Sequence, residues 1–261
     1  MAFVETATAD VEYFVDGNGA PLVLVHGTGG NAETNWGHLV DRFSGERRVV
    51  RPNYSGSGRT LDKGGALTVE RIGEEIIAAA DAADAAQFDL LGFSLGAAVT
   101  AWIAAHHPAR VRRLVLLAGF ANSGDTRLQC QFELWNRLIE TDRRAAAQLI
   151  LLTGFSPPFL STLSREELEI SIDEIVTGNN WDGMRRQVDL DLSLDVRAEA
   201  RAIRCPTLVL ACQHDHMVAP ANSRALHEAI KPSIYRELAS GHLAPLEVPD
   251  RFVEEVHRFL S

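Results

Sequence analysis

One serine, placed between two glycines where a predicted strand meets a predicted helix, constrains the fold of this chain most. Gly92-Phe93-Ser94-Leu95-Gly96 directly follows the apolar run 88–91 and directly precedes an apolar helix predicted over 95–106. Such a tight turn strains the serine backbone and exposes its hydroxyl at a helix N-terminus, where N–H groups favour developing negative charge. A serine that merely caps a helix is the alternative, which the strand-to-helix context disfavours.

Short runs rich in leucine and β-branched residues alternate with helix-like segments along the chain. These runs lack period-two alternation, as expected for strands covered on both faces of a parallel sheet. The Asp16-Gly17-Asn18-Gly19 turn predicts an initial hairpin, so the sheet should begin antiparallel and continue parallel. We therefore predict an α/β fold with a mostly parallel sheet of about eight strands and helices on both faces. The strand candidates are 11–15, 21–25, 48–51, 88–93, 111–117, 207–211 and 234–238, and the helix candidates are 32–43, 69–83, 95–106, 221–230 and 249–260.

The interval 121–203 breaks this rhythm because it contains helical patterns and no convincing strand. Helices are predicted over 128–139, 143–152, 166–176 and 184–192, with an extended turn at Ser156-Pro157-Pro158. We interpret 121–203 as a helical cap inserted after the strand 111–117, which is the fifth of these candidates and the sixth strand of the predicted sheet of about eight, and 1–120 with 204–261 as the core.

With these features the chain resembles the α/β-hydrolase superfamily over nearly its full length. His26-Gly27-Thr28-Gly29-Gly30 is similar to the family's oxyanion loop, and the segment 53–60 resembles its D-x-x-G-x-G-x-S turn, with Asn53 for Asp and Thr60 for Ser. We interpret the latter as a structural turn. Asp215 follows the predicted strand 207–211, and Ser240-Gly241-His242 follows the last predicted strand, 234–238. The order Ser, Asp, His is the order expected of this fold.

The resemblance implies a catalytic triad of Ser94, Asp215 and His242. A serine hydroxyl needs a neighbouring imidazole to take its proton, and the aspartate would orient that imidazole. Of the nine histidines, only His242 stands in a loop at a strand end without belonging to the oxyanion loop or flanking the acid. The backbone N–H groups of Thr28 and Leu95 would form the oxyanion hole.

The substrate pocket is less defined by the sequence. Phe93, Leu134, Trp135, Leu138, Phe155 and Phe159 are candidate lining residues, although they could equally pack the insertion on the core. Trp36 and Trp181 are further candidates that would more simply be core residues. We expect an apolar ester, lactone or thioester as substrate. A carbon–carbon bond hydrolase or lyase, a cofactor-free perhydrolase and a non-catalytic receptor remain alternatives.

The composition restricts the classes of binding partner and the cellular compartment that we expect. With 25 basic and 35 acidic residues the net charge is −10, which disfavours nucleic acid and anionic membranes. We expect a small-molecule substrate, no metal and no cofactor, since neither a ligand cluster nor a phosphate loop is found. A cytoplasmic location is expected because no leader or apolar span is evident.

Overall fold

The fold is built on a central sheet of nine strands in a computed structural model that describes all 261 residues. The strand order is β1-β2-β4-β3-β6-β7-β8-β9, with β5 beside β2. All pairs from β4 to β9 are parallel, whereas β1, β2 and β5 pair antiparallel. The predicted mostly parallel α/β fold is therefore confirmed. The strands are β1 (Ala2–Glu5), β2 (Ala9–Asp16), β3 (Ala20–Val25), β4 (Arg47–Asn53), β5 (Leu61–Asp62), β6 (Phe88–Phe93), β7 (Val111–Leu117), β8 (Thr207–Cys212) and β9 (Ser233–Leu238).

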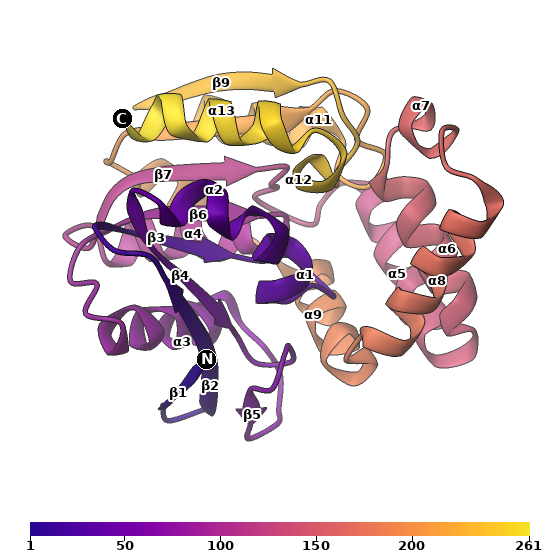
Figure 1. Cartoon of the computed structure of the whole chain (residues 1–261), viewed down its shortest axis with the longest axis horizontal. Coiled ribbons are helices and arrows are strands. Elements are labelled where there is room, and N and C mark those ends of the chain that lie inside the picture. Colours follow the sequence, from indigo (N-terminus) through magenta and orange to yellow (C-terminus); the bar gives the residue numbers. More distant parts are fainter.

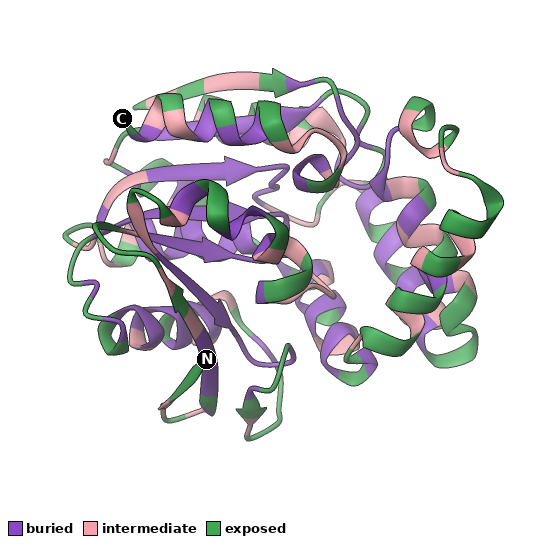
Figure 2. Ribbon diagram, in the orientation of Figure 1, coloured by how far each residue is buried: buried purple, intermediate pink, exposed green.

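Helices cover both faces of the sheet, and successive residues of one strand enter opposite cores. In β3, Val23 and Val25 belong to one apolar cluster, while Leu22 and Leu24 belong to the other. The buried strands of Figure 2 lie between these two layers. This double coverage explains why the strands read as continuous apolar runs. On one face lie α3 (Val69–Ala82), α4 (Leu95–His106) and α11 (Pro220–Ala229), and on the other α1 (Ala32–Trp36), α2 (Val40–Ser44), α12 (Ala244–Glu247) and α13 (Pro249–Leu260).

The hairpin predicted between the strands 11–15 and 21–25, which correspond to β2 and β3, is wrong. The chain does turn at Gly17 and Gly19, whose φ angles are +72° and +110°, but β4 lies between β2 and β3 in the sheet. A Cβ on Gly17 would lie 2.2 Å from the carbonyl oxygen of Ser44. The turn therefore crosses the start of β4, which separates the two strands.

Two local predictions also need correction. The single helix expected over 32–43 is divided into α1, the short 3₁₀ helix η1 (Gly37–Leu39) and α2, because Gly37 ends α1 as its C-cap. The extended turn expected at Ser156-Pro157-Pro158 is a one-turn helix, α7 (Pro157–Leu160), capped by the Ser156 side chain. Proline is compatible with the first helical turn because no intrahelical bond is lost there.

A helical insertion lies between β7 and β8, after the sixth strand if the two-residue β5 is not counted. Its helices cover the edge of the sheet to which the parallel strands point (Figure 1). Residues 122 and 195 form an isolated antiparallel bridge, so the chain leaves and re-enters the core at one place. The last helix, α10, packs against α4 and α11 of the core. The other helices are α5 (Thr126–Thr141), α6 (Arg143–Gly154), α7, α8 (Arg165–Gly178) and α9 (Trp181–Ser193), followed by α10 (Arg197–Ala202).

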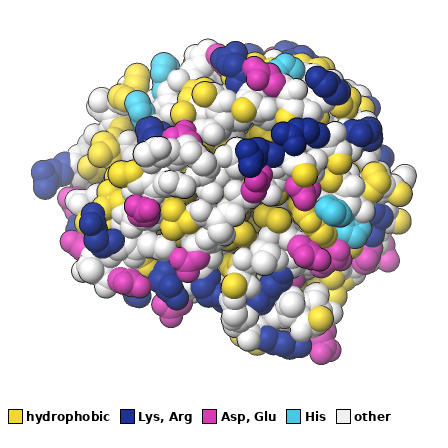
Figure 3. All heavy atoms as spheres, turned by 180° about the vertical axis from the view of Figure 1, so that it is seen from behind, with side chains coloured by type: hydrophobic (Ala, Val, Ile, Leu, Met, Phe, Trp, Pro, Cys, Tyr) yellow, Lys and Arg dark blue, Asp and Glu magenta, His cyan; other side chains and the backbone are white.

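Acidic and basic side chains are interspersed on the surface seen in Figure 3. None of the helices combines the length and the apolar composition that crossing a membrane requires.

Candidate active site

Ser94 occupies the sharp turn between β6 and α4, with φ 57° and ψ −119°. This conformation is strained for a non-glycine residue and is typical of functional sites. A Cβ on Gly92 would lie 2.2 Å from the Gly96 carbonyl oxygen, and one on Gly96 would lie 2.5 Å from that of His26. Both glycines are therefore required by the close approach of backbones around the serine.

The structure brings Ser94, His242 and Asp215 into one buried hydrogen-bonded chain. His242 Nε2 lies 2.9 Å from Ser94 Oγ, and His242 Nδ1 lies 2.7 Å from Asp215 Oδ2. Because a carboxylate oxygen accepts the Nδ1 proton, Nε2 is left to accept the proton of the serine hydroxyl. The arrangement can therefore generate a nucleophilic serine oxygen.

The two loops that carry Asp215 and His242 are held by backbone contacts. Asp215 Oδ1 accepts hydrogen bonds from the N–H groups of Met217 and Val218, at 2.8 and 2.7 Å, which leaves Oδ2 directed to the imidazole. Next to His242, a Cβ on Gly241 would lie 2.4 Å from the backbone nitrogen of Ser156. Only glycine therefore allows this loop to pack against the insertion.

Thr28 and Leu95 each offer a backbone N–H for which no acceptor is present. Leu95 is the first residue of α4, so its N–H has no intrahelical partner. In the loop of Thr28, the N–H of Gly27 donates to Asn35 Oδ1 at 3.0 Å, and those of Gly29 and Gly30 are also bonded. The loop lies beside the serine, since a Cβ on Gly27 would lie 3.0 Å from Ser94 Cβ, and Thr28 and Ser94 line the same cavity.

His26 supports the loop over 26–30 through hydrogen bonds and ring stacking. Its Nδ1 donates to the Gly27 carbonyl oxygen at 2.9 Å, its Nε2 lies 2.9 Å from Ser57 Oγ, and its ring stacks on Tyr54. Burial lowers the pKa of His26 to about 4, although the hydrogen bond to Gly27 acts in the opposite direction. The imidazole is therefore neutral at physiological pH. The Ser57 hydroxyl also donates a hydrogen bond to the Tyr54 carbonyl oxygen at 2.6 Å.

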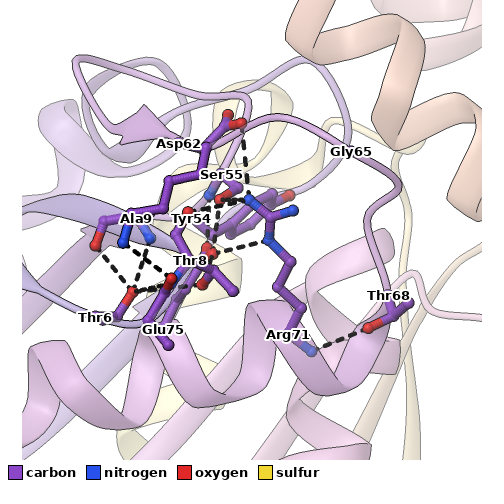
Figure 4. A network of polar contacts seen from close by, with 12 residues as sticks. Thr6, Thr8, Ala9, Tyr54, Ser55, Asp62, Gly65, Thr68, Arg71 and Glu75 are labelled. Carbon is purple, nitrogen blue, oxygen red and sulfur yellow. Dashed lines mark hydrogen bonds and ion pairs between the residues drawn. The ribbon is translucent and has the colours of Figure 1, made fainter.

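The turn over 53–60 carries no side chain into the cavity. Asn53 Oδ1 accepts from the N–H of Ala32 at 2.7 Å, and its Nδ2 donates to Glu12 at 2.7 Å. Glu75, fully buried, accepts from both the N–H and the hydroxyl of Ser55, at 2.8 and 2.6 Å. Figure 4 shows Ser55 and Glu75 together with Arg71 and Asp62. The contacts agree with the interpretation of the segment as a structural turn.

A cavity of about 370 Å³ lies above Ser94 and His242, between the loop 27–31 and the insertion. Three of the predicted lining residues, Phe93, Trp135 and Phe155, line it. Phe93 also packs on the imidazole of His242, with ring centroids 4.9 Å apart. The cavity is mostly apolar, and a polar rim on α8 and its C-terminal end includes Ser171, Glu174 and Asn179.

Leu134, Leu138 and Phe159 do not line this cavity, which corrects their predicted position. On α5 the cavity is reached by Phe132 and Trp135, three residues apart, whereas Leu134 and Leu138 share another face of the helix. Leu134 lines a separate hollow on the insertion's surface, and Leu138 packs against the large apolar cluster. Phe159 stacks behind Phe155, with ring centroids 4.7 Å apart.

Trp36 and Trp181 are also absent from the cavity wall. Trp36 is fully buried in the core beside Phe93 and Phe252, and Trp181 donates its indole N–H to the Val176 carbonyl oxygen. Ile150 and Leu151, two apolar residues of the insertion, also line the cavity. The sequence did not single out the remaining apolar lining residues, namely Phe132, Ile175, Met184, Met217, Leu243 and Leu246. Leu151 in α6 and Phe155 just after it are four residues apart. This spacing could have indicated which face of α6 points to the cavity. No group of three or more His, Cys, Asp or Glu side chains is arranged to hold a metal ion.

Similarity to known proteins agrees with this architecture. The chain is 50% identical to a pyrrolizixenacetamide deacetylase of Xenorhabdus hominickii over 260 residues, covering 100% of this chain and 98% of the relative. It is 24% identical to 3-oxoadipate enol-lactonase 2 of Acinetobacter baylyi, covering 92% of this chain and 89% of the relative.

Solved structures share the same fold. The enol-lactonase of Burkholderia xenovorans superposes with a TM-score of 0.86 at 26% identity, covering 97% of this chain and 96% of that one. MGS-M2, an alpha/beta hydrolase from a deep-sea metagenome, gives a TM-score of 0.91 at 22% identity, covering 99% and 97%. The sequence profile of the alpha/beta hydrolase family matches residues 22–255. This chain therefore belongs to the alpha/beta hydrolase family.

Proposed function

We propose that the protein hydrolyses an acyl bond of a small, largely apolar substrate through an acyl-enzyme on Ser94. One observation carries the proposal: Ser94 Oγ lies 2.9 Å from His242 Nε2 at the floor of the cavity, beside two backbone N–H groups without acceptors. A nucleophile, its base and donors for an oxyanion are the parts that acyl transfer requires.

In the first half-reaction, Ser94 Oγ attacks the substrate carbonyl carbon while its proton passes to His242 Nε2. Negative charge develops on the carbonyl oxygen, where the N–H groups of Thr28 and Leu95 can donate hydrogen bonds. Asp215 stabilises the imidazolium that forms. Collapse of the tetrahedral intermediate breaks the acyl bond, and the leaving amine or alcohol takes the proton from His242. Water then attacks the acyl-enzyme by the same route and releases the acid.

An N-acetyl amide is the first substrate to test, beside the ester, lactone and thioester predicted from the sequence. The relative at 50% identity is a deacetylase by name and aligns along the whole chain. A cavity of about 370 Å³ is at the small end of the range for small-molecule sites. These features favour a short acyl group on an apolar amine or alcohol of modest size.

We also propose that residues 121–203 act as a cap that selects the substrate. Side chains from α5, α6, α8 and α9 form the wall opposite Ser94. Such a wall excludes water from the acyl-enzyme and decides which substituent fits.

The experiment is a turnover panel with purified protein: para-nitrophenyl esters of graded chain length, N-acetyl derivatives of cyclic amines, lactones, acyl thioesters and a vinylogous 1,5-diketone for carbon–carbon cleavage. Ser94→Ala and His242→Ala should each lower kcat by roughly 10⁴-fold or more. Mass spectrometry after a fluorophosphonate pulse should find the label on Ser94 only.

Ser161→Ala is the matched control, since this serine is exposed at the end of α7. It should retain wild-type turnover. Undiminished hydrolysis by Ser94→Ala would refute the proposal, and turnover of the diketone alone would replace acyl transfer with carbon–carbon bond cleavage.

A further inference from the structure

Two side chains of α9 contact the loop that carries the free Thr28 N–H. Asp191 Oδ2 accepts a hydrogen bond from the Thr28 hydroxyl at 2.6 Å, and Gln187 Oε1 accepts one from the Gly29 N–H at 2.8 Å. Both side chains are fully buried and stand one helical turn apart on the same face. A helix of the insertion thus binds a core loop more than 150 residues earlier in the chain, since Thr28 and Asp191 are separated by 163 positions.

These contacts determine which N–H groups of the loop remain available. Gln187 occupies the Gly29 N–H, and Asp191 holds the side chain of Thr28 on the side of α9. The Thr28 N–H is left without an acceptor. These hydrogen bonds therefore fix the position of the loop and leave the Thr28 N–H free to donate to a substrate oxygen.

A contact between Gly183 and Gly56 sets the distance between α9 and the 53–60 turn. A Cβ on Gly183 would lie 2.0 Å from the carbonyl oxygen of Gly56, so the helix backbone touches the 53–60 turn directly. Arg186 then bonds both carboxylate oxygens of Asp62, at 2.9 and 3.0 Å. Asp62 in turn accepts a hydrogen bond from the Gly56 N–H at 3.1 Å.

The network of Figure 4 supports that turn from the core side. Arg71 approaches Asp62, with 3.7 Å between Nη2 and Oδ1, and also bonds Glu75. Glu75 holds Ser55, as described above. The buried polar groups of β2, α3 and the turn therefore form a rigid base for the first half of α9, which places Gln187 and Asp191 at the loop.

Asp191 is itself an unusual group to bury. Its Oδ1 has no hydrogen-bond partner, and neither has Nε2 of Gln187. Burial raises the pKa of Asp191 to about 8, against the opposing effect of the hydrogen bond from Thr28. The side chain is therefore mostly protonated at pH 7, and asparagine is the substitution that matches its shape without a charge.

We propose that Gln187 and Asp191 are positioning residues of the oxyanion site, which hold the loop so that the Thr28 N–H can donate to the substrate oxyanion. The inference rests on the proposed acyl transfer at Ser94. It predicts that loosening α9 contacts affects the tetrahedral state more than substrate binding, because the oxyanion exists only after attack.

The test is a double-mutant cycle of Thr28→Val and Asp191→Leu, with para-nitrophenyl acetate as substrate and phenylboronic acid as a probe of the tetrahedral state. Each single variant should lower kcat by roughly 10- to 100-fold with KM changed less than about 3-fold, a fraction of the loss of a whole donor. Boronate affinity should fall in parallel with kcat. The double variant should be no worse than the worse single one, because both remove the same contact.

Asp191→Asn should recover most of the activity lost in Asp191→Leu, as Asn Oδ1 can still accept from Thr28. Asp182→Leu is the matched control: it makes the same change at an exposed position of α9 and should leave kcat and boronate affinity unchanged. If Asp191→Leu fails to fold, judged by thermal unfolding, Thr28→Val with Thr28→Ser as its rescue provides the same test.

Wild-type kcat in a folded Thr28→Val, additive losses in the cycle, or an Asp191→Asn as impaired as Asp191→Leu would overturn the positioning role. These outcomes differ from failure of the proposed function. In that case wild type itself turns over no acyl substrate, or Ser94→Ala remains active.

Discussion

Glu247 of α12 bonds Ser156 of the insertion through both of its carboxylate oxygens. Oε2 accepts from the Ser156 N–H at 2.9 Å, and Oε1 accepts from its hydroxyl. Oε2 also accepts from the Gly241 N–H at 3.0 Å, directly before His242. A single carboxylate therefore joins the insertion to the loop that carries the proposed base.

We expect Glu247→Ala to lower the free energy of unfolding by about 2 kcal/mol, because it removes hydrogen bonds to a charged group and leaves two N–H groups unpaired. The same change should displace His242 and so lower kcat by roughly 10-fold, which corresponds to about 1.4 kcal/mol in the activation barrier. Urea unfolding and ester turnover measure the two effects. Glu254→Ala, on the exposed face of α13, is the control, and equal values for the two variants would contradict the prediction.

Substitutions in the cavity wall should change the ratio of activities among substrates. We expect Trp135→Ala and Phe155→Ala to change relative kcat/KM for acetyl and longer acyl esters by roughly 10-fold or more, since one methylene of fit is worth about 1 to 3 kcal/mol. Leu134→Ala is the control because it lies on the same helix as Trp135 but outside the cavity. If all three variants scale every substrate equally, the wall has no part in selection.

His26 should make stability depend on pH in the acid range. Its folded pKa of about 4 lies below the ordinary value of 6.5, so the unfolded chain takes up a proton that the folded protein does not. This contribution is fully present above pH 6.5 and is lost as pH falls through 4, a decrease of up to about 3 kcal/mol.

The measurement compares urea unfolding of wild type and His26→Asn from pH 7 to pH 4. Asparagine can still donate to the Gly27 carbonyl oxygen but does not titrate. The wild-type free energy of unfolding should therefore fall more steeply on acidification than that of the variant. Parallel curves would show that His26 is not buried neutral.

Gly183→Ala should disturb the loop that carries Thr28 and Gly29, because α9 is bonded to it. Its Cβ would lie 2.0 Å from the Gly56 carbonyl oxygen, so the helix must shift, at a cost of about 1 to 3 kcal/mol for overpacking. We expect reduced stability and a kcat lowered further than KM is raised. Gly45→Ala is the control, since a Cβ there meets nothing within 4 Å. Equal kcat in the two variants would separate α9 from catalysis.

The sequence by itself determined the features that depend on neighbouring residues. The turn around Ser94 requires Gly92 and Gly96 within five positions, and strands covered on both faces are apolar at most positions. Asp215 and His242 follow strands, and the carboxyl ends of parallel strands meet at one edge of the sheet. The class of fold could therefore be predicted without coordinates, and the resemblance to α/β hydrolases singled out these three side chains.

Only the tertiary structure decided the pairings between distant segments. The turn at Gly17 and Gly19 has the composition of a hairpin, yet β4 pairs with both β2 and β3 because the turn passes over its first residues. Leu134 and Leu138 are apolar, as the lining of a pocket would be. The orientation of α5 about its axis, however, directs Phe132 and Trp135 into the cavity instead. The contact of Thr28 with Asp191 spans 163 positions, and it exists because Gly56 and Gly183 let two backbones touch. Such contacts follow from the packing of whole elements, which no local pattern encodes.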